Sequence, residues 1–99
     1  MRIGVTTRVV EAATYVEPRD ALAQAWGDFL AAALPVGGRW LPLPNLGAER
    51  IVAFCEGWGI DGLILSGGED PGTVPLRDAT EFRLLAWAEE NGIPVLGVC

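Results

Sequence analysis

Short apolar runs alternate with amphipathic stretches along the whole chain, and this alternation is the feature that most constrains its fold. The runs are continuous, which is typical of strands that are buried on both faces. We predict four such strands, at residues 2–7, 39–44, 60–68 and 93–99. Strands separated by helices predict a mostly parallel sheet with helices on both faces, so the expected fold class is three-layer α/β.

Apolar residues recur at helical spacing in the segments between these strands. The spacing predicts helices at residues 19–34, 45–59 and 77–92. Asp20 is the predicted N-cap of the first helix. Asp78, with a glutamate three residues later, forms a predicted capping box at the start of the third.

The segment at residues 8–18 mixes polar and apolar residues, and we expect a loop there that Pro18 closes. Two prolines in the strand at 39–44 predict that it is short or near a sheet edge, because proline has no N–H to donate. Five side chains near the end of the first strand are candidates for lining a substrate pocket, although we favour surface and loop roles for them: Arg8, Tyr15, Glu17, Arg19 and Gln24.

The composition excludes several classes of function. With 13 acidic and 7 basic residues, the 99-residue chain carries a net charge of −6, so it lacks the basic patch that nucleic acid or an anionic membrane surface requires. No apolar segment approaches the roughly 18 residues of a membrane span. Two cysteines are too few for a disulfide scaffold. We therefore expect one cytoplasmic domain, or part of one.

Two further totals sharpen this expectation. The chain contains no histidine, which excludes ordinary zinc sites and any Cys–His or Ser–His pair within it, and we predict no metal or cofactor. It is 51% hydrophobic before its 13 glycines are counted, whereas typical domains reach about 45–50% with glycine included. Such a chain either packs both faces of a parallel sheet or requires a partner surface.

Two strand ends carry residues that suit chemistry. Ser66-Gly67-Gly68 follows the third strand, and Cys99 ends the fourth. Ligands of open α/β sheets lie beyond the carboxyl ends of the strands. If these strands are neighbours, a thiol lies beside glycine backbone N–H groups. A nucleophile beside such donors suits acyl transfer, in which an oxyanion develops.

Each of these features also has a purely structural interpretation. A glycine pair after a parallel strand is commonly a tight turn, and a cysteine at a strand end is often a small buried apolar residue. Cys55, on the inner face of its predicted helix, is assigned to packing. Arg77, Asp78 and Glu81 are interpreted as helix capping and surface charge.

Three motifs in residues 60–99 nevertheless occur together in a known family. They are Asp-Gly-Leu-Ile-Leu-Ser-Gly-Gly at 61–68, Arg-Asp-x-x-Glu at 77–81 and Pro-Val-Leu-Gly-Val-Cys at 94–99. In this order they resemble the first half of a class I glutamine amidotransferase domain, in the branch that includes the γ-glutamyl-γ-aminobutyrate hydrolases (peptidase family C26). The resemblance implies a flavodoxin-like sheet, and it covers the rest of the chain more loosely.

The resemblance also implies a role for each motif. Cys99 would be the nucleophile, Gly67 would belong to the oxyanion loop, and the Gly68 backbone N–H would bind the oxyanion. The substrate would be glutamine or another γ-glutamyl amide, which loses ammonia or an amine. Where ammonia is transferred, a synthase subunit would be the partner. In the family the chain continues past the cysteine as Arg-Gly-x-Gln, and a later His, oriented by a Glu, is the general base.

The chain stops at the residue that matches the family nucleophile. We therefore expect residues 1–99 to be the N-terminal half of a single incomplete domain, inactive alone as a glutaminase and able to self-associate through exposed sheet. Two alternatives are a non-catalytic α/β binding or interaction module and a truncated gene product. A continuation that carries His and Glu favours the enzyme, and a native stop codon with a stable product favours the binding module.

Overall fold

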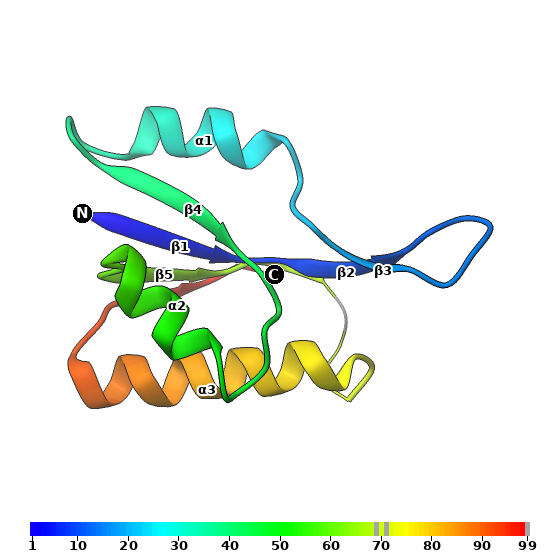
Figure 1. Ribbon diagram of the computed structural model, residues 1–99. Coiled ribbons are helices and arrows are strands. Elements are labelled where there is room, and N and C mark those ends of the chain that lie inside the picture. Colours follow the sequence, from blue (N-terminus) through cyan, green and yellow to red (C-terminus); the bar gives the residue numbers. More distant parts are fainter. Residues whose placement is uncertain (69, 71, 99) are drawn as a thin grey trace.

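The computed structural model describes residues 1–68, 70 and 72–98, and Figure 1 shows it. A four-stranded parallel sheet in the order β4-β1-β5-β6 forms its centre. The strands are β1 (Arg2–Thr6), β4 (Arg39–Leu43), β5 (Gly62–Leu65) and β6 (Val95–Gly97). All four predicted strands are confirmed, each somewhat shorter than expected. The proline-containing strand β4 lies at an edge of the described sheet, as predicted.

Helices cover both faces of this sheet, which confirms the predicted layers. Helix α1 (Ala25–Ala33) lies on one face, whereas α2 (Ile51–Trp58) and α3 (Pro75–Asn91) lie on the other (Figure 1). Gly59 and Gly92 end α2 and α3 in the left-handed conformation, which glycine adopts without a steric cost. None of the helices in the described part of the chain is long and apolar enough to cross a membrane.

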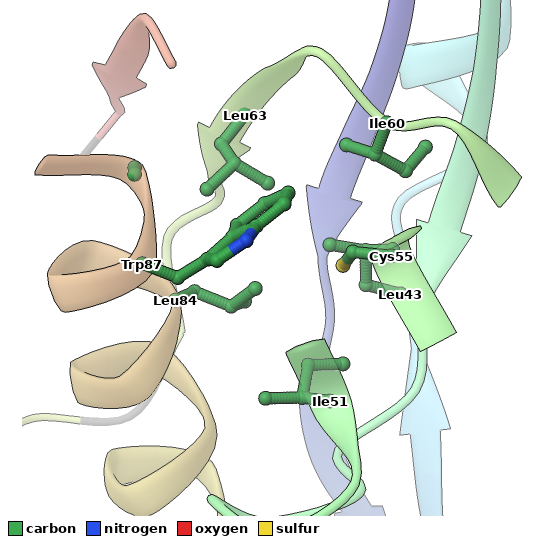
Figure 2. Close-up of a cluster of buried hydrophobic side chains, with 8 residues drawn as sticks. Leu43, Ile51, Cys55, Ile60, Leu63, Leu84 and Trp87 are labelled. Atoms are coloured by element: carbon green, nitrogen blue, oxygen red, sulfur yellow. The ribbon is translucent and has the colours of Figure 1, made fainter. Parts of the chain in front are cut away.

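The face under α2 and α3 holds the larger core. Trp87 of α3 lies between Leu63 of the sheet and Leu84 of its own helix (Figure 2). Continuous apolar strands place such side chains on both faces of the sheet, and helical spacing aims the facing ones back at it. The buried members of this core are Leu43, Ile51, Cys55, Ile60, Leu63, Leu84, Trp87 and Ala88.

The face under α1 holds a smaller core. Ile3 and Val5 of β1 and Ile64 of β5 are buried against Leu30 of the helix. Four further apolar side chains pack against this centre but are only partly buried, namely Leu22, Trp26, Leu34 and Trp40.

The prediction of a loop at residues 8–18 holds for residues 12–17 but is wrong for residues 8–11 and for Pro18, which lie in strands. Strands β2 (Arg8–Glu11) and β3 (Pro18–Ala21) pair in an antiparallel hairpin that extends beyond the carboxyl end of β1 (Figure 1). The β-branched residues Val9 and Val10 favour an extended backbone, and pairing with the second strand satisfies its hydrogen bonds.

Neither Asp20 nor Asp78 is the helix N-cap that was predicted, because each carboxylate accepts hydrogen bonds elsewhere. Asp20 lies in β3, where its carboxylate accepts hydrogen bonds from Asn45, and α1 follows Gln24 as its N-cap. The third helix begins at Pro75, because proline fits the first helical turn and needs no N–H partner there. Its N-cap is Val74. Asp78 instead accepts a hydrogen bond of 2.7 Å from the Gly72 N–H.

Candidate functional site

The carboxyl ends of β1, β5 and β6 meet at one edge of the sheet. Strands β5 and β6 pair in parallel, with Leu65 opposite Gly97, and the Val98 N–H donates to the Leu65 carbonyl at 2.9 Å. The glycine pair follows β5 directly. These two strands are therefore neighbours, which the sequence analysis had stated only as a condition. Cys99 lies outside the described residues.

Ser66 ties the end of β5 to the end of β1. Its N–H donates to the Thr6 hydroxyl oxygen at 2.9 Å, and its own hydroxyl donates to the Thr6 carbonyl at 2.6 Å. Both residues are buried. Buried hydrogen bonds of this kind are costly to leave unmade, so they fix where the glycine pair leaves the sheet.

Arg77 of α3 holds the same residue from the helix side. Its guanidinium Nη2 donates to the Ser66 carbonyl at 2.6 Å and forms an ion pair of 3.2 Å with Glu81. Arg77 is only 3% exposed. The interpretation of Arg77 and Glu81 as capping and surface charge is therefore wrong, because a buried arginine needs such partners to offset its lost hydration. The spacing of four residues between the two on one helix was the available signal.

Gly68 lies in close contact with two arginines. A Cβ built on Gly68 would overlap the Arg77 guanidinium and would lie 3.0 Å from the Arg8 Cβ. Gly68 is not among the glycines of positive φ, so close approach rather than a left-handed turn explains why glycine is required. The simple turn interpretation does not account for this position.

The hairpin brings Arg8 to the glycine pair and is itself fastened to the sheet. The backbone N–H and the side-chain amide of Asn45 donate to the two Asp20 carboxylate oxygens at 2.9 and 2.8 Å. The same amide donates to the Thr7 carbonyl at 3.2 Å. These contacts set the position of the hairpin over the strand ends.

The other candidate pocket residues remain in solvent, as favoured. Arg19 donates to Glu17 at 2.6 and 2.9 Å and to the Tyr15 hydroxyl at 2.5 Å, and all three are exposed. Gln24 is exposed at the start of α1. Of the five candidates, only Arg8 therefore adjoins the glycine pair.

Cys55 does not belong to the site. It is completely buried in the core under α2. Burial, followed by the negative charge of Glu56, raises the pKa of its thiol from 9.0 to about 11. A thiol that stays neutral in an apolar core is unreactive, which confirms its assignment to packing.

Two other features bear on where this protein can bind a ligand. In the described part of the chain no three His, Cys, Asp or Glu residues gather as metal ligands. A hollow of about 520 Å³ lies at the amino ends of β1 and β4, beside Arg2, Arg39 and Trp58. Open α/β sheets bind ligands at the carboxyl ends of their strands. The glycine pair therefore marks the better candidate site.

The fold and the site thus define an α/β protein with a parallel sheet and a glycine pair at its strand ends. No protein-family model matches the chain. The chain is 33% identical over 105 aligned residues to a gamma-glutamyl-CDP-amidate hydrolase of Campylobacter jejuni. That similarity covers 100% of this chain and 50% of the hydrolase. The chain therefore spans about half the length of this curated relative.

Proposed function

We propose that this chain is the N-terminal half of a Cys-dependent γ-glutamyl amide hydrolase of the class I glutamine amidotransferase type. The observation that supports it most is the pairing of β5 with β6. This pairing joins the strand before the glycine pair to the strand that precedes Cys99 in the sequence. The similarity to a hydrolase of a γ-glutamyl compound supports the same class.

In the proposed reaction the Cys99 thiolate attacks the γ-carbonyl carbon of the substrate. The tetrahedral oxyanion accepts hydrogen bonds from the oxyanion loop at Gly67 and Gly68. Collapse of this intermediate breaks the C–N bond, and the leaving amine takes a proton from a general acid. Water then hydrolyses the thioester, which releases glutamate and restores the thiol.

The general acid and base lie outside these residues. The 99 residues contain no histidine, and other side chains rarely take over its role beside a cysteine nucleophile. We therefore propose that residues 1–99 alone are inactive. A polypeptide with the missing histidine would complete the site.

The substrate proposal is a γ-glutamyl amide, with a nucleotide-linked amine as the first candidate because the relative acts on γ-glutamyl-CDP-amidate. Glutamine itself is the second candidate, with ammonia passed to a synthase subunit. The relative is a hydrolase, which favours simple hydrolysis with release of the amine over transfer of ammonia to a synthase subunit.

The first experiment is to read the gene through and beyond the Cys99 codon and to express the complete reading frame. Hydrolysis of glutamine and of γ-glutamyl amides is then measured for the wild type, Cys99→Ala and Cys55→Ala. We expect Cys99→Ala to lower kcat by at least about 10³-fold, because the covalent route is removed. Cys55→Ala is the matched thiol control and should retain activity.

Two results would contradict the proposal. One is full activity in Cys99→Ala. The other is amide hydrolysis by residues 1–99 alone that clearly exceeds the same segment with Cys99→Ala. A stop codon directly after Cys99, with a stable and soluble product, would instead favour the binding module.

A further inference from the structure

The buried guanidinium of Arg77 lies against the glycine pair, and it has no role in the reaction steps proposed above. Arg77 is 3% exposed although it lies in the first turn of a helix that faces solvent on one side. Arginine is rarely buried without a specific partner, because removing its charge from water is costly. The identity of its partners therefore indicates what the residue does.

Two partners among the described residues, Ser66 and Glu81, restrict the direction of the guanidinium group. Nη2 donates to the Ser66 carbonyl at 2.6 Å and to Glu81 Oε2 at 3.2 Å. The guanidinium is planar, so two contacts through one nitrogen fix the orientation of the whole group better than an ammonium would. Glu81 also balances the buried positive charge.

Fixing the Ser66 carbonyl also fixes the next N–H group. The peptide bond is planar and trans, so the Ser66 C=O and the Gly67 N–H lie in one plane and point in opposite directions. Arg77 takes the carbonyl, and the Gly67 N–H consequently points away from the guanidinium. Thr6 of β1 holds the Ser66 N–H and the Ser66 hydroxyl, so the residue that carries this carbonyl is itself tied to the sheet.

Gly68 is fixed by contact with the same group. A Cβ at this position would overlap the Arg77 guanidinium, so the Gly68 backbone packs directly against it. The guanidinium thus supports two consecutive peptide units of the loop, one by a hydrogen bond and one by packing.

We propose that Arg77 is a positioning residue that presets the Gly67-Gly68 backbone for an oxyanion, which rests on the function proposed above. It does not touch the substrate. It acts by holding N–H donors in place before the charge develops, so that little reorganisation is needed in the transition state.

The test compares Arg77→Ala, Arg77→Lys and Arg83→Ala in the protein from the complete reading frame. Arg83 is a partly exposed arginine on the same helix and serves as the matched control. We expect Arg77→Ala to lower kcat by about 10²-fold, the scale of a lost oxyanion donor. KM and the rate of Cys99 alkylation by iodoacetamide should stay near the wild-type values.

Arg77→Lys should recover part of the lost kcat, because lysine restores the charge and one donor but not the planar group. Arg83→Ala should leave kcat unchanged. The proposal is overturned if Arg77→Ala keeps its kcat. It is also overturned if Arg77→Lys changes kcat, KM and alkylation in parallel, since that pattern indicates general unfolding.

A second readout does not depend on the reaction. Amide hydrogen exchange at Gly67 and Gly68 is measured by NMR in Arg77→Lys and Arg83→Ala. We expect faster exchange at these two amides in Arg77→Lys alone, with the sheet unchanged. If the wild type shows no Cys99-dependent hydrolysis, the proposed function fails, and unchanged exchange in Arg77→Lys would separately overturn the positioning role.

Discussion

The two faces of the sheet differ in how completely the chain covers them. Under α2 and α3 the core is closed, with Leu84 at 0% exposure and Trp87 at 5%. Under α1 the centre is buried, but Phe29 is 53% exposed and Leu96 is 54% exposed. Both side chains line a hollow of about 290 Å³ between α1 and β6, together with Ala23, Ala25, Trp26 and Val98.

The chain closes the core under α2 and α3 with its own helices, but it leaves part of the apolar face under α1 exposed. One long and one short helix cover the closed face, whereas a single helix of nine residues covers the other. Strand β6 pairs only with β5 in the described sheet, and its residues are exposed. An apolar face beside an open strand edge is typical of a surface that more polypeptide covers.

The largest predicted effect tests the closed face directly. Leu84→Ala should lower the free energy of unfolding by about 3–5 kcal/mol, because it leaves a cavity among fully buried side chains. Leu96→Ala removes the same atoms from an exposed position and should cost less than about 1 kcal/mol. Urea unfolding of both variants, followed by circular dichroism, measures the difference.

The comparison of the two faces would be wrong if the two leucines had equal effects. A large loss in Leu96→Ala would mean that the face under α1 is already closed in solution. Wild-type m-values should be retained in both variants, since a changed m-value would indicate a different unfolded state rather than a lost contact.

Cys55 gives a second test, through pH. Its pKa is raised to about 11 in the folded protein, so the folded state keeps a proton that the unfolded state loses. Stability from this group is complete below pH 9 and is lost between pH 9 and 11, by about 2–3 kcal/mol in total. All seven basic residues are arginines, so lysine titration does not obscure this window.

Cys55→Ala is the control for this pH dependence. Its unfolding free energy will be lower at neutral pH because of the cavity, but the fall between pH 9 and 11 should largely disappear. Every group other than Cys55 is common to the two proteins, so its contribution cancels in the difference. An identical fall in both proteins would show that water reaches the Cys55 thiol and that the core under α2 is not closed.

The sequence predicted the layered fold because burial on both sides of a parallel sheet produces continuous apolar strands. It failed at the hairpin, where Arg8 and Arg19 interrupt the apolar pattern. The pairing of β2 with β3 is a tertiary contact that local composition does not specify. The start of α1 was misplaced for the same reason, since the hydrogen bonds of Asp20 to Asn45 span 25 residues.

The site was predictable only in part. The α/β pattern identified the two strand ends as candidate positions, but it left open whether their strands are neighbours, and the order β4-β1-β5-β6 supplies that. Arg77 was missed because a charged residue in a helix normally faces solvent. Its burial depends on the loop that packs over it, 11 residues earlier in the chain. Such a role requires the three-dimensional structure.

The open face should promote self-association of residues 1–99 when they are studied alone. Phe29→Glu places a charge in the hollow and should weaken association about tenfold, which corresponds to about 1.4 kcal/mol. Val36→Glu adds the same charge at a fully exposed turn outside the hollow and should have little effect. Sedimentation velocity over a concentration series measures both, and equal behaviour of the two variants would assign association to another surface.

The smallest predicted effect tests whether α1 unfolds together with the rest of the molecule. Among the residues that the structure describes, a Cβ on Gly57 of α2 would meet nothing within 4 Å, and one on Gly27 of α1 would meet only Trp40 at 4.0 Å. Neither glycine has a positive φ. Each change to alanine should therefore raise the free energy of unfolding by about 0.5 kcal/mol, since alanine lowers the entropy of the unfolded chain. Global stability registers this gain only if the helix unfolds with the sheet.

Equal gains would mean that α1 is firmly held although its face is incompletely covered. A gain at Gly57 alone would mean that α1 opens separately, and the contrast between the faces would then be one of local stability rather than missing polypeptide.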